Sequence, residues 1–320
     1  MIIVLSPMAG INDKTFRSLC LSMGADVVYT EMISVNGLVN GNKKSFEMLP
    51  LPKENAVIQL FGNDPEYFSR AVDIIMKYNA RWVDLNAGCP VPKVVKNGYG
   101  AALMKNPLLV RKLVEVMTSK GIHVSVKMRV GWKKEQNFMD VARAASDGGA
   151  FLVSIHGRTV EQGYSGNADW EPARILKKNL KIKIGVSGDI FTPDDAINAM
   201  NYTNADMLFI ARGAIGNPWI FRQIKEKISG DIPKVVTFRE RRDVLKQHLM
   251  STIKEHGVHG IMFFRKFLAA YLKGLPESHA VKARTLRTSD LRLLMGIVNA
   301  YFDKLISCEQ GGVERGNTQS

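Results

Sequence analysis

Short apolar runs rich in β-branched residues recur along the first two thirds of the chain, and stretches with a helical period separate most of them. Eight runs are predicted to be strands: Ile2–Ser6, Val27–Glu31, Ala56–Leu60, Trp82–Asn86, Val124–Met128, Phe151–His156, Ile182–Val186 and Met207–Ala211. They follow one another at about 25 to 30 residues, with one longer gap after Asn86, and a strand–loop–helix–loop unit requires this length. Capping residues precede several intervening helices, at Asp64-Pro65, Asn106-Pro107 and Thr192-Pro193. The pattern favours an α/β fold closed as a (β/α)₈ TIM barrel over an open doubly wound sheet, the competing architecture.

The pattern changes after Ile232-Pro233, where helical periodicity continues without strands. The amphipathic stretches predicted to be helices are Thr237–His256, Gly260–Lys273 and Ser289–Leu305. We therefore predict a barrel domain at residues 1–235, a smaller all-helical domain at 236–308 and a disordered tail at 309–320. Between Lys234 and Ile306 the chain carries 14 Lys and Arg against 6 Asp and Glu, so the helical domain is predicted to be basic.

The whole chain of 320 residues has a formal net charge of +14, which favours a polyanionic partner such as nucleic acid. Its three cysteines, Cys20, Cys89 and Cys308, have neither disulfide nor zinc-site spacing, so we expect no metal and a reducing compartment. The apolar run at Ile2–Leu5 is much shorter than a signal-peptide core, and no segment approaches the ~20 apolar residues of a membrane span. We expect a soluble, cytoplasmic protein without a membrane partner.

The predicted strands end in polar residues. In this architecture the C-terminal strand ends build the active site, so each end forms one wall of it. The candidates are Ser6–Gly10, Thr30–Met32, Gln59, Asn86–Pro90, Lys127 and Arg129, His156–Arg158, Ser187–Asp189 and Ala211–Gly213. A single polar residue at a strand end is more often structural than functional, but polar residues at all the ends together indicate a binding site.

The ends of the last two strands predict a phosphate site. Gly188 and Gly213 let backbone amides approach a phosphate, Arg212 supplies positive charge, and such barrels commonly bind phosphate there. Gln59 can hydrogen-bond a planar heterocycle, and Lys127 can stabilise the negative charge that the ring acquires on reduction. One ring with one terminal phosphate matches FMN. NAD is not expected as a resident cofactor, because the sequence has no dinucleotide-binding fingerprint.

Cys89 lies between Gly88 and Pro90 in the long loop after the fourth predicted strand, where a structural cysteine would have little core to fill. A thiol in this place can be a nucleophile, a proton donor or an inert residue. Cys20 lies on a predicted helix and is expected in the core.

These residues resemble the bacterial tRNA-dihydrouridine synthases, and the resemblance covers nearly the whole chain. The blocks that carry it are Ser6–Gly10, Asn12–Arg17, Thr30–Met32, Gln59–Gly62, Asp84–Pro90, Val126–Trp132, His156–Thr159, Tyr164–Trp170 and Ala211–Trp219.

The resemblance implies a two-stage reaction, in which NADPH reduces bound FMN and the reduced flavin then passes a hydride to C6 of a uracil ring in the D-loop of tRNA. It identifies Cys89 as the general acid that donates a proton to C5. It assigns FMN binding to Pro7, Met8, Ala9, Gln59, Lys127, His156, Ser187, Gly188, Asp189, Ala211, Arg212 and Gly213. Asn86 matches a position beside the substrate base, and we assign Arg129 and Arg158 to the substrate side as well.

The basic helical domain has a physical role under this interpretation. Extracting a uridine from a folded loop costs a few kcal/mol, which contacts to the RNA backbone elsewhere must offset. Our hypothesis is that tRNA phosphates bind to Arg265, Lys266, Lys282, Arg284 and Arg287. We expect the protein to act as a monomer. A solvated helix face is the alternative explanation for each of these residues.

The chain departs from the family at several positions. Ser187 stands where the family usually has Asn, which implies a shorter or water-mediated contact to the cofactor; Ser6, Asn12 and Met128 are replacements that we expect to be neutral. Two other functions remain open: an FMN-dependent dehydrogenase for a free pyrimidine or another small molecule, and an RNA-binding protein on the same barrel that uses no flavin.

Overall fold

A computed structural model of the chain describes residues 1–51, 53–133 and 136–316. The chain divides into two compact units. The first consists of Met1–Gly213 and Ile220–Asp231, and the second consists of Ala214–Trp219 and the chain from Ile232 on. The roles that we assigned to the domains remain predictions.

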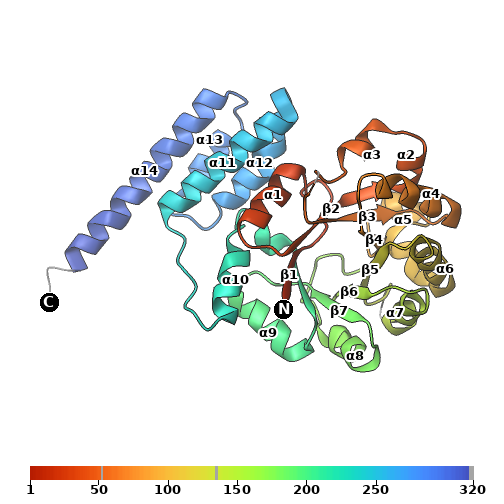
Figure 1. Ribbon diagram of the computed structural model, residues 1–320. Coiled ribbons are helices and arrows are strands. Elements are labelled where there is room, and N and C mark those ends of the chain that lie inside the picture. Colours follow the sequence, from red (N-terminus) through yellow and green to blue (C-terminus); the bar gives the residue numbers. More distant parts are fainter. Residues whose placement is uncertain (52, 134–135, 317–320) are drawn as a thin grey trace. The chain divides into compact units, whose positions relative to one another are not determined.

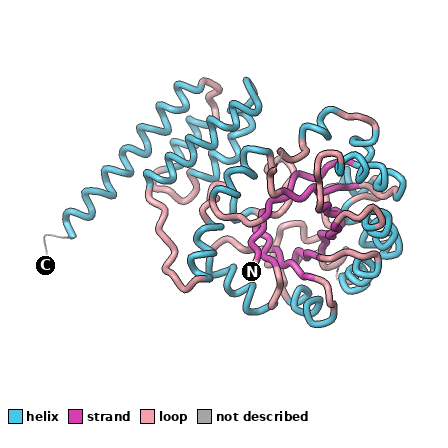
Figure 2. The backbone as a smooth tube through the Cα atoms, viewed as in Figure 1, coloured by secondary structure: helices cyan, strands magenta, loops and turns pink. Residues whose placement is uncertain are grey.

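The first unit is a closed barrel of parallel strands in the order of the sequence (Figures 1 and 2). The strands are β1 (Ile2–Leu5), β2 (Val27–Ser34), β3 (Ala56–Phe61), β4 (Trp82–Ala87), β5 (His123–Arg129), β6 (Leu152–His156), β7 (Lys183–Ser187) and β8 (Met207–Ile210). Strand β1 pairs with β8 as well as with β2, which closes the ring. The predicted (β/α)₈ barrel is confirmed, and the open sheet is wrong.

Helices follow the strands and surround the ring (Figure 1). They are α1 (Lys14–Ser22), α2 (Val35–Val39), α3 (Lys43–Glu47), α4 (Pro65–Met76), α5 (Pro92–Lys96), η1 (Gly100–Lys105), α6 (Pro107–Thr118), α7 (Phe138–Asp147), α8 (Glu171–Asn179), α9 (Pro193–Thr203), η2 (Arg212–Ala214) and α10 (Ile220–Ile228). The predicted caps Asp64, Asn106 and Thr192 each accept a hydrogen bond from a backbone N–H group in the first turn of α4, α6 and α9. The long gap after Asn86 holds the short helices α5 and η1.

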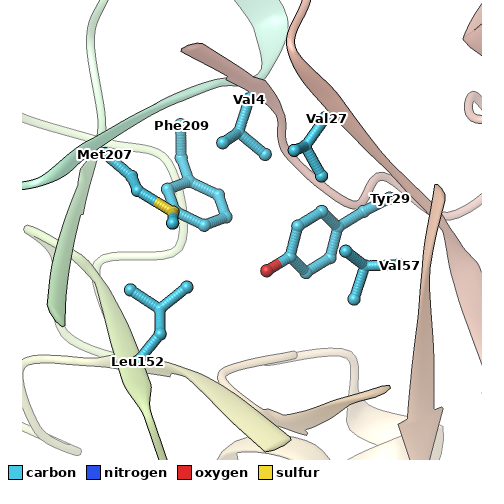
Figure 3. Packing of buried hydrophobic residues seen from close by; sticks show 7 residues of the cluster. All are labelled: Val4, Val27, Tyr29, Val57, Leu152, Met207 and Phe209. Carbon is cyan, nitrogen blue, oxygen red and sulfur yellow. The ribbon is translucent and has the colours of Figure 1, made fainter. Parts of the chain in front are cut away.

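The barrel interior near the strand starts is filled by apolar side chains (Figure 3). The cluster consists of Val4, Val27, Tyr29, Val57, Leu152, Met207 and Phe209. The Tyr29 ring packs edge-on against Phe209, with 5.4 Å between the ring centres. Burying such side chains contributes about 1.5–3 kcal/mol each, so this layer stabilises the barrel and leaves polar chemistry to the opposite strand ends.

The second unit is helical over its described residues. It contains α11 (Phe238–His256), η3 (Gly257–His259), α12 (Gly260–Tyr271), α13 (Ser278–Thr285) and α14 (Leu291–Gly316). His248 of α11 is buried, and its ring contacts Phe264, Phe267 and Tyr271 of α12.

Two features of the second unit differ from the expected pattern. Helix α13 falls in a segment for which no helix was expected. Helix α14 continues to Gly316, through most of the expected tail, and residues 317–320 lie outside the described residues. Across residues 1–51, 53–133 and 136–316, the structure contains no helix that is both long and apolar enough to span a bilayer.

Candidate active site

A cavity opens at the C-terminal ends of the barrel strands. It holds about 560 Å³ of empty space, counting the part open to solvent. Its walls are formed by Ser6, Pro7, Met8, Lys127, His156, Tyr164, Ser187, Gly188, Asp189, Ile190, Phe191, Phe209, Ala211, Arg212 and Gly213. Most residues assigned to the cofactor from the sequence lie in this set, whereas Ala9 and Gln59 lie outside it.

Asp189 joins the arginines of two strand ends. Its carboxylate accepts hydrogen bonds from Arg158 Nη2 at 2.6 Å, from Arg212 Nη2 at 3.0 Å and from the backbone N–H of Ala168 at 2.8 Å. Burial raises the pKa of the Asp189 carboxyl, but these hydrogen bonds and the two guanidinium charges outweigh it and hold the pKa below its ordinary value. Asp189 is therefore ionised and connects the loops after β6, β7 and β8.

His156 is neutral at physiological pH. Burial, followed by the positive charges of Lys127, Arg129 and other nearby cations, lowers the pKa of its imidazole from 6.5 to about 2. Its Nε2 lies 3.3 Å from Arg158 Nη1, and because a guanidinium group only donates, Nε2 accepts and the proton resides on Nδ1. The cavity thus has a neutral imidazole among cations.

Lys127 is half-buried in the wall of the cavity. Burial lowers the pKa of its amine from 10.5 to about 8, against the opposing effect of the Asp84 carboxyl. The amine is still protonated at neutral pH. It can therefore supply positive charge to a bound anion inside the barrel.

Gln59 is 2% exposed and is not one of the residues that line the cavity. Its Nε2 donates to Asp84 Oδ2 at 2.8 Å, and its Oε1 accepts from Asn86 Nδ2 at 2.8 Å. Each polar end of the Gln59 amide therefore has a partner within the protein. The expected role of Gln59, binding a planar ring, did not foresee these partners.

Asn86 caps the loop that carries Cys89. Its Oδ1 accepts from the backbone N–H groups of Gly88 at 3.2 Å and of Cys89 at 3.0 Å. The carbonyl of Cys89 accepts from Ala101 at 3.0 Å, and the carbonyl of Gly88 accepts from Arg129 Nε at 3.0 Å. The Cys89 peptide is therefore held from both sides.

The Cys89 thiol is half-buried. Burial raises its pKa above the usual 9.0, although a backbone hydrogen bond from Val91 and the charge of Arg129 act in the opposite direction. The thiol is therefore protonated at neutral pH, which is the form that a general acid needs.

The guanidinium groups of Arg129 and Arg158 have protein partners. Arg129, which is 3% exposed, donates from Nη1 to the carbonyls of Thr159 at 2.7 Å and Gly163 at 2.9 Å. Arg158, which is 2% exposed, donates to the carbonyls of Ser165 and Gly166 in addition to Asp189. These contacts order the loops at the mouth, and direct binding of substrate by either residue stays a prediction.

Tyr164 is a wall residue to which the sequence assigned no role. Its side chain is 61% exposed, and its ring lies 4.8 Å from the Arg212 guanidinium and 5.7 Å from that of Arg129. The sequence marked Tyr164 only as the first residue of a block that carries the family resemblance, and the structure places it between Gly163 and Gly166, both of which have positive φ. A tyrosine in such a turn is common on protein surfaces, so its place beside the arginines required the fold.

The glycines of the last two strand ends serve close packing of the loops. A Cβ at Gly188 would lie 2.6 Å from the Cβ of Ala168, and one at Gly213 would lie 2.2 Å from the carbonyl oxygen of Ile190. Both glycines line the cavity, but the space beside each Cα is occupied by protein. The sequence analysis explained these two glycines by access of a phosphate to backbone amides, and close packing of the loops is a second reason for them.

The five basic residues predicted to bind tRNA lie in the second unit. Arg284 and Arg287 are exposed, and Lys282 is half-buried. Arg265 Nη2 lies 3.4 Å from Ser289 Oγ, and the Lys266 amine lies over the rings of Phe263 and Phe267.

Known proteins with similar sequences cover nearly the whole chain. Residues 4–294 match the family model described as dihydrouridine synthase (Dus). The chain is 34% identical over 310 residues to the tRNA-dihydrouridine synthase B of Shewanella oneidensis, covering 95% of this chain and 96% of that protein. It is 32% identical over 317 residues to that of Pasteurella multocida, covering 97% of this chain and 96% of that protein.

Solved structures with the same fold are more distant. A histamine dehydrogenase from Rhizobium sp. 4-9 has a TM-score of 0.55 at 13% identity, over 96% of this chain and 62% of that one. A 2-naphthoyl-CoA reductase has a TM-score of 0.53 at 10% identity, over 72% of this chain and 50% of that one. At these identities the similarity shows the barrel fold alone.

Proposed function

This chain belongs to the dihydrouridine synthase family, and from this premise we propose that it reduces the C5=C6 bond of D-loop uridines in tRNA. The observation that carries the proposal is the protonated Cys89 thiol, held by Asn86 and Arg129 in the loop after β4. Reduction of this bond adds a hydride to one carbon and a proton to the other, so the site needs a proton donor of this kind.

The cavity residues fit FMN by the chemistry of their donors. Arg212 and the loops after β7 and β8 suit a phosphate group, and Lys127 suits a ring that becomes anionic on reduction. The hydride for C6 of uracil would come from bound FMN in its reduced form, which NADPH would regenerate. The residues that would hold it are those of the cavity wall, with Ser187 to Asp189 and Ala211 to Gly213 as the phosphate side.

The protein's own residues perform the remaining chemistry. Cys89 donates its proton to C5, and the resulting thiolate is reprotonated from solvent before the next turnover. In this proposal Asn86 lies beside the base, and its side chain fixes the Gly88 and Cys89 peptides of the loop that carries the proton donor. Arg129 holds the loops after β4 and β6 together while the base is bound.

The second unit supplies the affinity for tRNA in this proposal. It carries most of the excess positive charge, with 14 Lys and Arg against 6 Asp and Glu between Lys234 and Ile306. Phosphate contacts from Arg265, Lys266, Lys282, Arg284 and Arg287 would offset the cost of extracting the uridine from its stack. We further propose that the enzyme works as a cytoplasmic monomer.

The test is turnover by the purified holoprotein on tRNA that lacks dihydrouridine. With FMN and NADPH, we expect dihydrouridine to appear in tRNA, detected by mass spectrometry of the digested nucleosides, and free uridine to remain unreduced. Reduction of free uridine or uracil at a comparable rate would instead identify a small-molecule dehydrogenase. A protein that binds tRNA but takes up no flavin would contradict both functions.

A further inference from the structure

A buried chain of hydrogen bonds connects the barrel interior with the loop of Cys89. Asp84 on β4 is fully buried and accepts from Ser125 Oγ at 2.5 Å and from Gln59 Nε2 at 2.8 Å. Gln59 Oε1 accepts from Asn86 Nδ2 at 2.8 Å, and Asn86 Oδ1 accepts from the backbone N–H of Cys89 at 3.0 Å. Only Gln59 and Asn86 therefore separate the Asp84 carboxylate from the Cys89 peptide.

The two ends of this chain dictate the orientation of the amides between them. A backbone N–H group only donates, so Asn86 presents its oxygen to Cys89 and its nitrogen to Gln59. Above about pH 7 the Asp84 carboxyl is mostly ionised and only accepts, so Gln59 presents its nitrogen to Asp84 and its oxygen to Asn86. The Cys89 N–H group and the Asp84 carboxylate therefore require the same orientation of the two amides. A group at position 84 that donated toward Gln59 would favour the reverse orientation.

Hydrogen bonds through Ser125 hold the Asp84 carboxylate in position. Ser125 Oγ, which donates to Asp84, accepts from Trp82 Nε1 at 2.8 Å and lies 3.4 Å from the Tyr29 hydroxyl. The rings of Tyr29 and Trp82 pack edge to face, with 5.8 Å between their centres. The carboxylate is therefore fixed by the packed layer below it.

Packing alone does not account for a carboxyl group at this position. Burying an acid is unfavourable unless hydrogen bonds compensate for lost hydration, and an apolar side chain of similar volume commonly stabilises a core at least as well. The neighbouring layer is filled by residues such as Val4 and Leu152. Burial raises the pKa of Asp84 to about 7 in spite of the bonds from Ser125 and Gln59 and the charge of Lys127, which indicates how unfavourable the site is for the charge.

We propose that Asp84 is a positioning residue for Cys89, acting through Gln59 and Asn86 to hold the peptide of the proton donor in place. The inference rests on the proposed function, in which Cys89 protonates C5 of uracil. Asp84 is not a residue of the cavity wall, although its charge acts on Lys127, which is; its effect on Cys89 is transmitted by the orientation of two amides.

The first test measures the position of Cys89 without any turnover. Alkylation of Cys89 by iodoacetamide is followed by peptide mass spectrometry in the oxidised holoprotein, in a Cys308→Ser background that removes the exposed thiol, while Cys20 is buried. Asp84→Leu replaces both carboxylate oxygens by methyl groups and removes the acceptor for Gln59. Asp84→Asn also removes the charge but keeps an oxygen for Gln59 and offers its N–H to Ser125 Oγ.

We expect Asp84→Leu to accelerate alkylation of Cys89 about tenfold. A Cys89 loop that is no longer held in place exposes the thiol to water, and a fall of about one unit in the thiol pKa raises the thiolate fraction tenfold. Asp84→Asn should stay within about twofold of the parent protein. Equal acceleration in both variants would assign the effect to charge and overturn the proposal, as would no acceleration in either. If Asp84→Leu is not folded, Gln59→Leu breaks the same chain one link further on, and unchanged alkylation there contradicts the proposal.

The second test separates this inference from the proposed function. If the parent protein modifies tRNA, Asp84→Leu should slow oxidation of the reduced flavin by tRNA up to about 100-fold, the scale of loss that an ångström of misplacement produces. Flavin content, flavin reduction by NADPH and the KM for tRNA should remain within about twofold, and Asp84→Asn should recover most of the rate. Equal losses in both half-reactions would show a merely structural role. A parent protein without turnover would contradict the proposed function. The alkylation rates would then still show whether Asp84 positions Cys89.

Discussion

Burial and neighbouring charge decide which side chains of the mouth are ionised. Burial raises the pKa of the Cys89 thiol and lowers that of Lys127 to about 8. His156, whose pKa falls to about 2, lies within the same cavity wall as Lys127. A protonated thiol, a protonated amine and a neutral imidazole therefore coexist at neutral pH, and that combination suits hydride transfer accompanied by proton donation.

The role of Cys89 predicts a split between two half-reactions. In Cys89→Ala, reduction of the flavin by NADPH should remain within about twofold of the parent rate, while dihydrouridine formation should fall about 10²- to 10⁴-fold, the usual range for loss of a general acid. Bleaching of the visible flavin absorbance measures the first step, and mass spectrometry of tRNA nucleosides measures the second. Cys308→Ala, which changes an exposed thiol on α14, is the matched control. Persistence of both steps in Cys89→Ala would mean that the proton comes from another group.

His156 predicts a stability that declines in acid. The unfolded chain protonates this imidazole below its ordinary pKa of 6.5, whereas the folded protein does so only near pH 2, so acid favours the unfolded state throughout this window. At about pH 5 the penalty from this residue amounts to about 2 kcal/mol. His156→Gln should therefore lose less thermal stability between about pH 7.5 and about pH 5 than the parent protein. Calorimetry of both proteins checks this, with the exposed His279→Gln as control; identical acid sensitivity in all three would contradict the assigned cause.

At the scale of elements, helix caps shape the loops that line the cavity. Thr192 Oγ1 accepts from the backbone N–H of Asp195 at 3.1 Å, and Asp195 Oδ2 accepts from those of Thr192 at 2.9 Å and Phe191 at 3.0 Å. Phe191 lies in the cavity wall. The start of α9 and the wall after β7 are therefore one local structure, readable from the sequence because both capping partners lie within a few residues.

Removal of this cap should destabilise the protein by an amount typical of helix caps. Thr192→Ala is expected to lower the free energy of unfolding by about 1 kcal/mol, because an N–H group in the first turn of α9 loses its acceptor. Chemical denaturation of the barrel unit measures the change. Asp194→Asn in the same turn should change stability by less than about 0.5 kcal/mol, since the Asp194 side chain is 71% exposed in its ion pair with Lys227. Similar losses in both variants would argue against the capping box as the cause.

At the scale of the whole molecule, positive charge is concentrated in one part of the chain. The 73 residues from Lys234 to Ile306 carry a net +8 of the total +14, from 14 Lys and Arg and 6 Asp and Glu. Residues 1–233 carry a net +7, from 29 Lys and Arg and 22 Asp and Glu, so their positive charge is spread over about three times as many residues. This division predicts that RNA affinity and reduction of the flavin respond to different mutations.

Charge reversal in the second unit tests this division. Arg284→Glu with Arg287→Glu should weaken tRNA binding and flatten its salt dependence, with the log–log slope falling by about 0.7 to 0.9 for each phosphate that the variant no longer neutralises. Reduction of the flavin by NADPH should be unchanged. The control pair Lys77→Glu and Arg81→Glu reverses the same charge at exposed positions before β4, at the end of the barrel opposite the mouth. Equal weakening of binding by both pairs would indicate a general effect of net charge, and unchanged binding in the first pair would rule out these two arginines as phosphate ligands.

The amino-acid sequence by itself determined the barrel and most of its wall. Strand periods, caps such as Asp64 and Thr192, and the repeat of strand and helix act over a few residues, so they are legible without the fold. The Cys89 loop was likewise marked by its Gly and Pro neighbours.

Only the tertiary structure decided the partners of Gln59, Arg129 and Arg158, the place of Tyr164 beside the arginines, and the link from Asp84 to Cys89. Gln59 and Asp84 lie 25 positions apart in the chain, and Asp84 and Ser125 lie 41 apart. Hydrogen bonds between different strands depend on register and on which face of each strand a side chain occupies, and closure of the barrel settles both at once.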